Sequence, residues 1–182
     1  MRGVVSNATP LIYLAKTGRI DLLRKVFGTV FIPEEVRVEV VDKGKLLKEK
    51  DAYTIEKAIH EGWLKVFAAK TIKVPIKLDK GEVAALSLAK KLKLNVVLLD
   101  EVSARSAARL LDLTPRGTVF VLLKALEKKE IGLDEFLEVL SQLISEGFRL
   151  KEEVYVEAVK EAKRISSEAG HAPRRNTSEG DL

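Results

Sequence analysis

Hydrophobic positions recur along this chain with two spacings, one typical of buried strands and one typical of amphipathic helices. Short apolar runs that end at turn residues predict strands at residues 3–6, 29–32, 63–67, 96–99 and 113–116. Apolar residues at helical spacing predict helices at residues 11–16, 20–27, 33–41, 51–61, 79–92, 102–111, 119–126, 133–144 and 151–165. Strands and helices therefore alternate over most of the sequence.

This alternation predicts an α/β fold, because strands joined through helices form right-handed crossovers and a mostly parallel sheet with both faces covered. The order of the strands does not follow from the pattern. Residues 43–50 contain four lysines and are expected to be a solvated loop. We expect one domain over residues 1–165. Residues 166–182 lack hydrophobic periodicity and are predicted to be a disordered tail.

The composition restricts the chemistry that this chain can carry. Its 182 residues are 46% hydrophobic and 32% charged, which is typical of a globular domain with a core of its own. No apolar run is long enough to span a membrane and no signal-peptide pattern opens the chain, so we expect a cytoplasmic protein. Cysteine is absent and the two histidines, His60 and His171, are too scattered for a zinc cluster, so any metal must be bound through oxygen.

Charge and glycine content narrow the choice of ligand. The formal net charge of +5 favours a polyanionic partner without identifying one. No glycine-rich fingerprint follows the first predicted strand and no GxxxxGK motif occurs, which argues against dinucleotide binding and P-loop nucleotide binding.

Four polar residues follow or flank the predicted strands on the side where the strands end. They are Asn7, Glu39, Glu82 and Asp100. In a parallel sheet these positions come to the same edge, which is the edge where such sheets bind ligands. Each residue also has a purely structural interpretation: Asn7 or Asp100 as a helix cap, Glu39 as a surface residue, and Glu82 as the partner of Asp79 in a capping box.

Taken together, the four residues favour a metal site. Three carboxylates at one edge repel one another unless a cation neutralises them, and hard oxygen ligands suit Mg²⁺ or Mn²⁺. We therefore expect Glu39, Glu82 and Asp100 to lie within one metal shell with Asn7 facing them. We also expect at least one of these acids to hold its proton more tightly than an isolated acid does.

Four segments carry a resemblance to a known family. They are VVSNATPLIYLAK (residues 4–16), IPEEV (32–36), KGEVAA (80–85) and LLDE (98–101). Their order and spacing resemble an archaeal and bacterial branch of the PIN-domain family that includes the VapC-type toxins of toxin–antitoxin pairs. The similarity covers about residues 3–160 and implies a three-layer α/β/α sandwich, a metal-dependent nuclease and a homodimer.

The resemblance also implies roles for single residues. It places the family's four acidic positions on Asn7, Glu39, Glu82 and Asp100, with Glu39, Glu82 and Asp100 as catalytic residues. The expected ligands of a Mg²⁺ or Mn²⁺ ion are Asn7, Glu82, Asp100 and Glu101. Thr9 and Thr118 match supporting polar positions, and Arg105, one helical turn after Glu101, is a candidate for contact with RNA.

Asn7 departs from the family pattern, because an amide oxygen can bind a cation but carries no negative charge. Three functions stay open from the sequence. The first is an endoribonuclease that hydrolyses single-stranded RNA, for which an antitoxin protein would be a further partner. The second is a PIN-like module that binds RNA or a protein without cutting. The third is an α/β domain that accepts a phosphoryl group on Asp100 or binds a small nucleotide.

Overall fold

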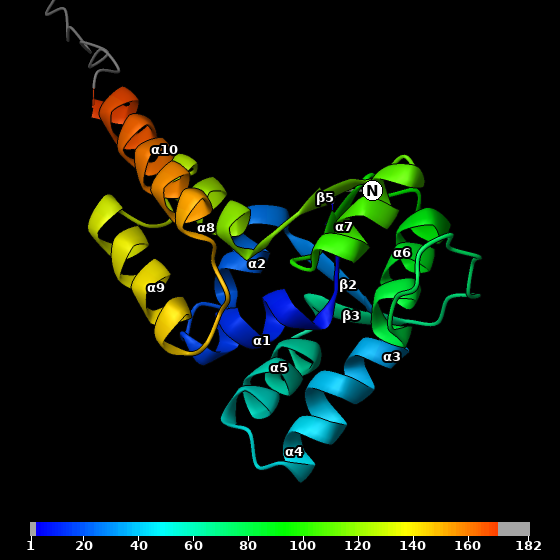
Figure 1. The fold of residues 1–182 in the computed structure, drawn as a ribbon. Helices are drawn as coiled ribbons and strands as arrows, with labels where there is room; N and C mark the ends of the chain where they lie inside the picture. Colours follow the sequence, from blue (N-terminus) through cyan, green and yellow to red (C-terminus); the bar gives the residue numbers. More distant parts are fainter. Residues whose placement is uncertain (1–2, 171–182) are drawn as a thin grey trace, which may run out of the picture.

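The computed structural model describes residues 3–170 and confirms the α/β fold with helices on both faces of a parallel sheet (Figure 1). The strands are β1 (Gly3–Ser6), β2 (Thr29–Pro33), β3 (Leu64–Phe67), β4 (Val96–Leu98) and β5 (Thr114–Arg116). They lie in the order β3-β2-β1-β4-β5, and every neighbouring pair is parallel.

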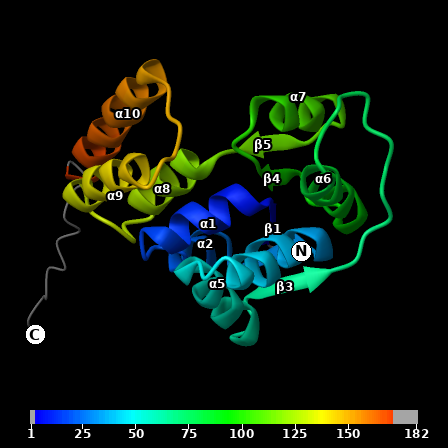
Figure 2. The same ribbon diagram turned by 60° about the horizontal axis from the view of Figure 1, so that its bottom comes forward.

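The helices occur along the chain in the predicted order relative to the strands. Their bounds are α1 (Ala8–Lys16), α2 (Asp21–Phe27), α3 (Glu34–Arg37), the π-helix η1 (Val38–Lys43), α4 (Gly44–Leu46), α5 (Lys50–His60), α6 (Lys80–Leu92), α7 (Val102–Leu110), α8 (Thr118–Glu127), α9 (Leu133–Ser145) and α10 (Glu152–Gly170). Figure 2 shows α8, α9 and α10 grouped at one end of the molecule, with α6 and α7 on the opposite side. No helix in residues 3–170 is long and apolar enough to cross a membrane.

Alternate residues of the central strands supply two separate cores. Val4 on β1, Val30 on β2 and Leu98 on β4 pack with α1, α2, α5 and α8 in the larger core. Their neighbours Val5 and Val97 pack on the other face with the alanine-rich sides of α6 and α7. This division follows from the two-residue period of a strand and explains why consecutive residues in the middle of these strands are apolar.

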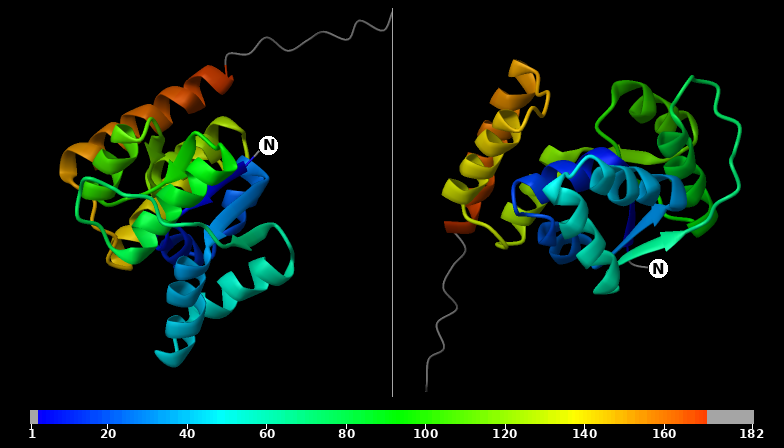
Figure 3. Two further views of the ribbon diagram at one scale, coloured as in Figure 1. Left: turned by 90° about the vertical axis from the view of Figure 1, so that its right-hand side faces the viewer. Right: turned by 90° about the horizontal axis from the view of Figure 1, so that it is seen from below.

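Two segments differ from the sequence-based expectation. Residues 43–50 are not a loop throughout, because η1 and α4 continue the helix that begins at Glu34, and Figure 3 shows this helical arm projecting away from the sheet. The π-helical turn was not predictable from a pattern with a period of 3.6 residues. Helix α10 continues to Gly170, so the tail does not begin at Ser166 as expected. The remainder of the predicted tail, including His171, lies outside the described residues.

The strand order places a topological switch between β1 and β4. From β1 the chain moves to β2 and β3 on one side, and it then returns to place β4 and β5 on the other side. Helices that leave the two strands on either side of such a point diverge and leave a crevice at the carboxyl ends of the strands. Asn7 and Asp100 both lie at this crevice, because Asn7 follows β1 directly and Asp100 comes two residues after β4.

A substitution at Leu98 tests how much the pairing of β1 with β4 contributes to the core, because the Leu98 side chain is fully buried in the larger core. Leu98→Ala should lower the free energy of unfolding by about 2–5 kcal/mol, since it removes buried methyl groups and leaves a cavity. Leu110→Ala is the matched control, because Leu110 is 63% exposed and its loss should cost less than about 0.5 kcal/mol. Urea denaturation of both variants measures the difference, and equal costs would contradict this assignment of the core.

Candidate active site

Asn7 lies at the end of β1 with its side chain 6% exposed. Its backbone N–H donates to the carbonyl of Leu98 at 3.0 Å, which extends the β1–β4 pairing by one residue. Its side-chain Oδ1 is buried and accepts no hydrogen bond from any described residue. A buried acceptor without a donor is costly, and an oxygen in this state is suited to binding a cation.

Glu39 and Asp79 approach Asn7 around Gly81. A Cβ atom added to Gly81 would lie 3.3 Å from Asn7 Oδ1, 3.3 Å from Glu39 Oε2 and 3.4 Å from Asp79 Oδ1. Glu39 comes from the first turn of the π-helix η1, and π-helical turns occur often at functional sites. The missing side chain of Gly81 therefore leaves a small space that three oxygen-bearing side chains face.

Glu82 is held in this group by a capping box at the start of α6. Asp79 Oδ1 accepts the backbone N–H of Glu82 at 2.7 Å, and Glu82 Oε2 accepts the backbone N–H of Asp79 at 3.0 Å. The structural interpretation of Glu82 is thus confirmed. It does not exclude a role in the site, because the other carboxylate oxygen of Glu82 takes no part in the box. The box fixes the carboxylate of Glu82, a residue that is 5% exposed, where the charges of Asp79 and Glu39 act on it.

Asp100 does not cap the helix that follows it. Its Oδ1 accepts the backbone N–H of Thr118 at 2.8 Å, and its Oδ2 accepts the Thr118 hydroxyl at 2.7 Å. Thr118 is the first residue of α8, so the carboxylate lies at the positive end of that helix dipole. Gly117 permits this approach, since a Cβ there would come within 2.7 Å of Asp100 Oδ1.

Glu101 and Arg105 complete the surroundings of Asp100. The guanidinium of Arg105 donates to the carbonyl of Leu99 at 3.1 Å, and its charge favours the ionised form of Asp100. Burial lowers the pKa of Arg105, and the nearby charge of Arg109 lowers it further. Glu101 is exposed, and its negative charge acts on both Asp100 and Glu82. Glu101 therefore links the acids around Gly81 electrostatically to Asp100.

All three predicted catalytic acids hold their protons more tightly than isolated acids. Burial is the main cause of the raised pKa of Glu39, Glu82 and Asp100. Neighbouring charge adds to it: Asp79 raises the pKa of Glu39, and Asp79, Glu101 and Glu39 raise that of Glu82. The direction agrees with our prediction, although desolvation rather than mutual repulsion dominates.

The geometry of the acids differs from our prediction in one respect. Among the residues that the structure describes, no three His, Cys, Asp or Glu side chains come together closely enough to hold a metal ion between them. Glu39, Glu82 and Asp100 thus do not form one ready-made shell. They are divided into one group around Gly81 and another at the start of α8, because the capping box and Thr118 each hold a carboxylate in place.

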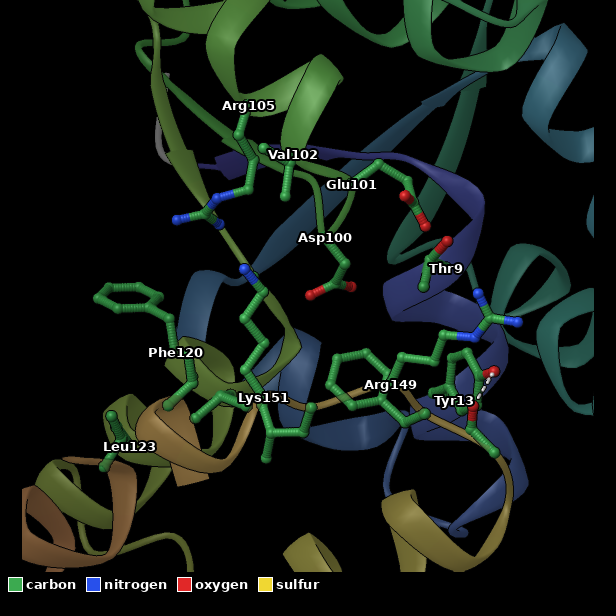
Figure 4. Close-up of a pocket in the computed structure, with 16 residues that line it drawn as sticks. Thr9, Tyr13, Asp100, Glu101, Val102, Arg105, Phe120, Leu123, Arg149 and Lys151 are labelled. Carbon is green, nitrogen blue, oxygen red and sulfur yellow. Dashed lines mark hydrogen bonds between the residues drawn. The ribbon is translucent and has the colours of Figure 1, made fainter. Parts of the chain in front are cut away.

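Beside Asp100 the structure contains a cavity of about 1220 Å³. Thr9 and Glu101 lie on one side of it, and Arg149 and Lys151 reach into it from the segment between α9 and α10 (Figure 4). Sequence reasoning missed both cations. The signal that identifies them is the apolar–polar alternation of Phe148, Arg149, Leu150 and Lys151 after Gly147, which places the two cations on the same side of an extended segment.

The comparison with protein families agrees with this architecture. A family model described as a PIN domain matches residues 3–164, which is nearly all of the described part of the chain. The chain belongs to the PIN-domain family. PIN domains are generally nucleases, which supports a hydrolase that acts on nucleic acid. No curated protein gives a significant match to this chain.

Asp100 provides a pH test of the site. Burial raises its pKa in the folded protein above the ordinary value of 3.8, so the folded state binds this proton more tightly than the unfolded state does. The stability that Asp100 contributes is therefore complete below the ordinary pKa and is lost as the pH rises through the raised value. In Asp100→Asn this contribution is absent, while the amide can still pair with Thr118.

Urea denaturation of wild type and Asp100→Asn between about pH 4 and pH 7 measures this effect. The stability of wild type relative to the variant should fall as the pH rises. Glu39 and Glu82 titrate in both proteins and cancel in the difference. A relative stability that rises with pH would show that the Thr118 hydrogen bonds and Arg105 outweigh burial.

Proposed function

We propose that this PIN domain is a metal-dependent endoribonuclease that hydrolyses phosphodiester bonds in single-stranded RNA. The observation that carries the proposal is the buried Oδ1 of Asn7, which lacks a hydrogen-bond donor among the described residues and faces the acids around Gly81. A fold that needed only a turn or a cap at this position would pair that oxygen with a backbone N–H.

The oxygen atoms in this region fit a hard divalent cation. An unpaired amide oxygen and the carboxylates of Glu39 and Glu82 are the ligand types that Mg²⁺ and Mn²⁺ take, and Mg²⁺ often keeps several of its waters. Asn7, Glu39 and Glu82 would therefore hold such an ion, with Asp100 and Glu101 as the further candidates. When bound, the ion would polarise a phosphate oxygen and make a water molecule more acidic.

The side chains themselves supply the remaining functions. Burial and the charge of Asp79 raise the pKa of Glu39, so its carboxylate is a stronger base than that of an isolated glutamate and can accept a proton from water. Asp100 is fixed by two hydrogen bonds from Thr118, which keeps its charge at the crevice. Hydrolysis consumes one water, breaks one P–O bond of the RNA backbone, and leaves a phosphate on one product and a hydroxyl on the other.

Two features of the same site support a second function, which differs from the nuclease only in that the RNA is bound without efficient cleavage. Asn7 carries no charge, and the carboxylates around it are divided into two groups. Both features weaken metal affinity relative to a site with four converging acids. The alternative is a PIN-like module that binds RNA or a protein partner and cuts slowly or not at all. The two candidates differ in the rate of metal-dependent cleavage.

We also propose a biological role for this nuclease, which rests only on the resemblance to the VapC-like branch. In the VapC-like branch such a ribonuclease acts as the toxin of a toxin–antitoxin pair, which would give this chain an antitoxin protein as a partner. A homodimer and a cytoplasmic location belong to the same interpretation.

The charge at position 7 separates the two candidates. Asn7→Asp adds an anionic oxygen at the end of β1 and should tighten Mn²⁺ binding by about tenfold or more, with a matching rise in RNA cleavage. Asp100→Asn should lower cleavage by at least about a hundredfold. Both changes are nearly isosteric, so they isolate charge from packing. Calorimetry with Mn²⁺ and gel analysis of a labelled single-stranded RNA provide the two measurements.

The outcomes assign the function. Cleavage by wild type that Asp100→Asn abolishes supports the nuclease. Cleavage by Asn7→Asp alone supports the binding module. If neither wild type nor Asn7→Asp binds Mn²⁺ or cuts single-stranded RNA, the proposed metal site is wrong.

Gly81 permits a test that leaves every proposed ligand unchanged. Gly81→Ala places a methyl group 3.3 Å from both Asn7 Oδ1 and Glu39 Oε2, so it should weaken Mn²⁺ binding by about tenfold. The higher helix propensity of alanine offsets part of the cost of these close contacts, and urea denaturation checks that the variant is folded. Gly132→Ala is the control, since nothing lies within 4 Å of its added Cβ. Unchanged Mn²⁺ affinity in Gly81→Ala would place the metal elsewhere.

A further inference from the structure

We infer that the segment between α9 and α10 is the element of this protein that grips the nucleic-acid backbone, through Arg149 and Lys151. The inference rests on the proposed function for its substrate class, and it assigns the contacts to a part of the chain outside the four segments that carry the family resemblance. The reasons are the position of the two side chains, their lack of partners and the rigidity of the segment that carries them.

The two cations face the acids across the cavity. Asp100, Glu101 and Thr9 line one part of the cavity, and Arg149 and Lys151 line another part of it. Figure 4 shows the ammonium of Lys151 extending toward the side where Asp100 and Arg105 lie, while Arg149 extends below Thr9 and Glu101. A phosphate bound by these cations would therefore lie next to the carboxylates of Asp100 and Glu101.

Neither cation forms a polar contact that stabilises the described part of the fold. Arg149 and Lys151 are exposed, and neither side chain makes an ion pair or hydrogen bond with another residue in the described part of the chain. Some arginines elsewhere in the described chain behave differently: Arg164 pairs with Glu161 and Glu168, and Arg37 pairs with Glu34 and Asp42. Two cations without carboxylate partners beside a cavity are available to neutralise an anionic ligand.

The segment is nevertheless held firmly in place. Phe148 is 8% exposed, and its ring makes an edge contact with Tyr13 at a centroid distance of 5.1 Å. The Tyr13 hydroxyl donates to the carbonyl of Gly147 at 3.2 Å, and Leu150 packs against the larger core. Since Phe148 and Leu150 face inward, Arg149 and Lys151 must face outward. Fixed cations lose less entropy on binding than cations on a mobile loop.

The aromatic wall of the cavity indicates the class of anion. Phe120 lines the cavity, and the guanidinium of Arg116 lies 4.6 Å from the centroid of its ring. Cations combined with an aromatic face are typical of sites that bind single-stranded nucleic acid, in which the backbone contacts the cations and bases stack on the ring. A site for free phosphate alone would have no use for the ring.

The test measures binding without cleavage. Fluorescence anisotropy with a labelled oligouridine in EDTA compares wild type with the double variant Arg149→Gln/Lys151→Gln. The variant should bind at least about tenfold more weakly, and the slope of log affinity against log salt should fall by about 1.4, because each lost phosphate contact removes about 0.7. The control Lys160→Gln/Lys163→Gln removes the same charge from α10 outside the cavity and should change affinity by less than about twofold.

The outcomes distinguish this inference from the proposed function. If wild type cleaves RNA with Mn²⁺ while the double variant binds like the control, the inference is wrong and the nuclease stands. If wild type never cleaves but binding depends on Arg149 and Lys151, the inference stands and the nuclease is wrong. Absence of RNA binding in wild type overturns the inference. So does tighter binding of polyglutamate than of RNA through the same two residues, which would assign the cavity to an acidic protein.

Discussion

The pairing of β1 with β4 is the constraint on which the rest of the site depends. The hydrogen bond from the Asn7 N–H to the Leu98 carbonyl continues this pairing to the end of the sheet, and the Leu99 N–H extends the next pair by bonding to the Arg116 carbonyl. Because of these two bonds, the segments that follow β1, β4 and β5 all begin at the same edge of the sheet, where the strands end. Because β1 and β4 are joined across a switch in topology, that edge is also where the helices diverge.

Several acids can lie at one edge of the sheet only if local interactions stabilise their negative charges. The protein supplies them separately for each group: a capping box with two backbone N–H groups around Asp79 and Glu82, and the N-terminus of α8 with the Thr118 hydroxyl for Asp100. These interactions stabilise the ionised carboxylates, whereas burial opposes ionisation. The same anchors keep the two groups apart. The hydrogen bonds that anchor the acids in the fold therefore determine how the carboxylates are arranged around any bound cation.

The sequence predicted the parts of this structure that depend on local patterns. The strand before Asp100, the capping box at Asp79 and the parallel sheet follow from apolar runs and cap residues, and the structure confirms all three. The partner of Asp100 could not be predicted in this way, because Thr118 lies 18 residues away and meets it only through the β4–β5 pairing. The π-helical turn at Glu39 also has no signature in a pattern of helical period.

The cations of the cavity were missed for a different reason. Residues 148–151 alternate between apolar and cationic, but they stand where one predicted helix has ended and the next begins at Lys151, and alternation over four residues is too short to identify a strand. Only the contact of Phe148 with Tyr13, 135 positions earlier in the chain, shows which side of the segment faces the acids. Local sequence therefore identified the acids of this site, while tertiary contacts determine what lies opposite them.

The most direct test of this account is a crystal soaked in Mn²⁺ and measured for anomalous scattering. We expect a manganese peak beside Gly81, bounded by Asn7 Oδ1 and the carboxylates of Glu39 and Glu82. Peaks only at exposed surface carboxylates, with none at the carboxyl end of β1, would contradict the central claim that this edge of the sheet is a metal site.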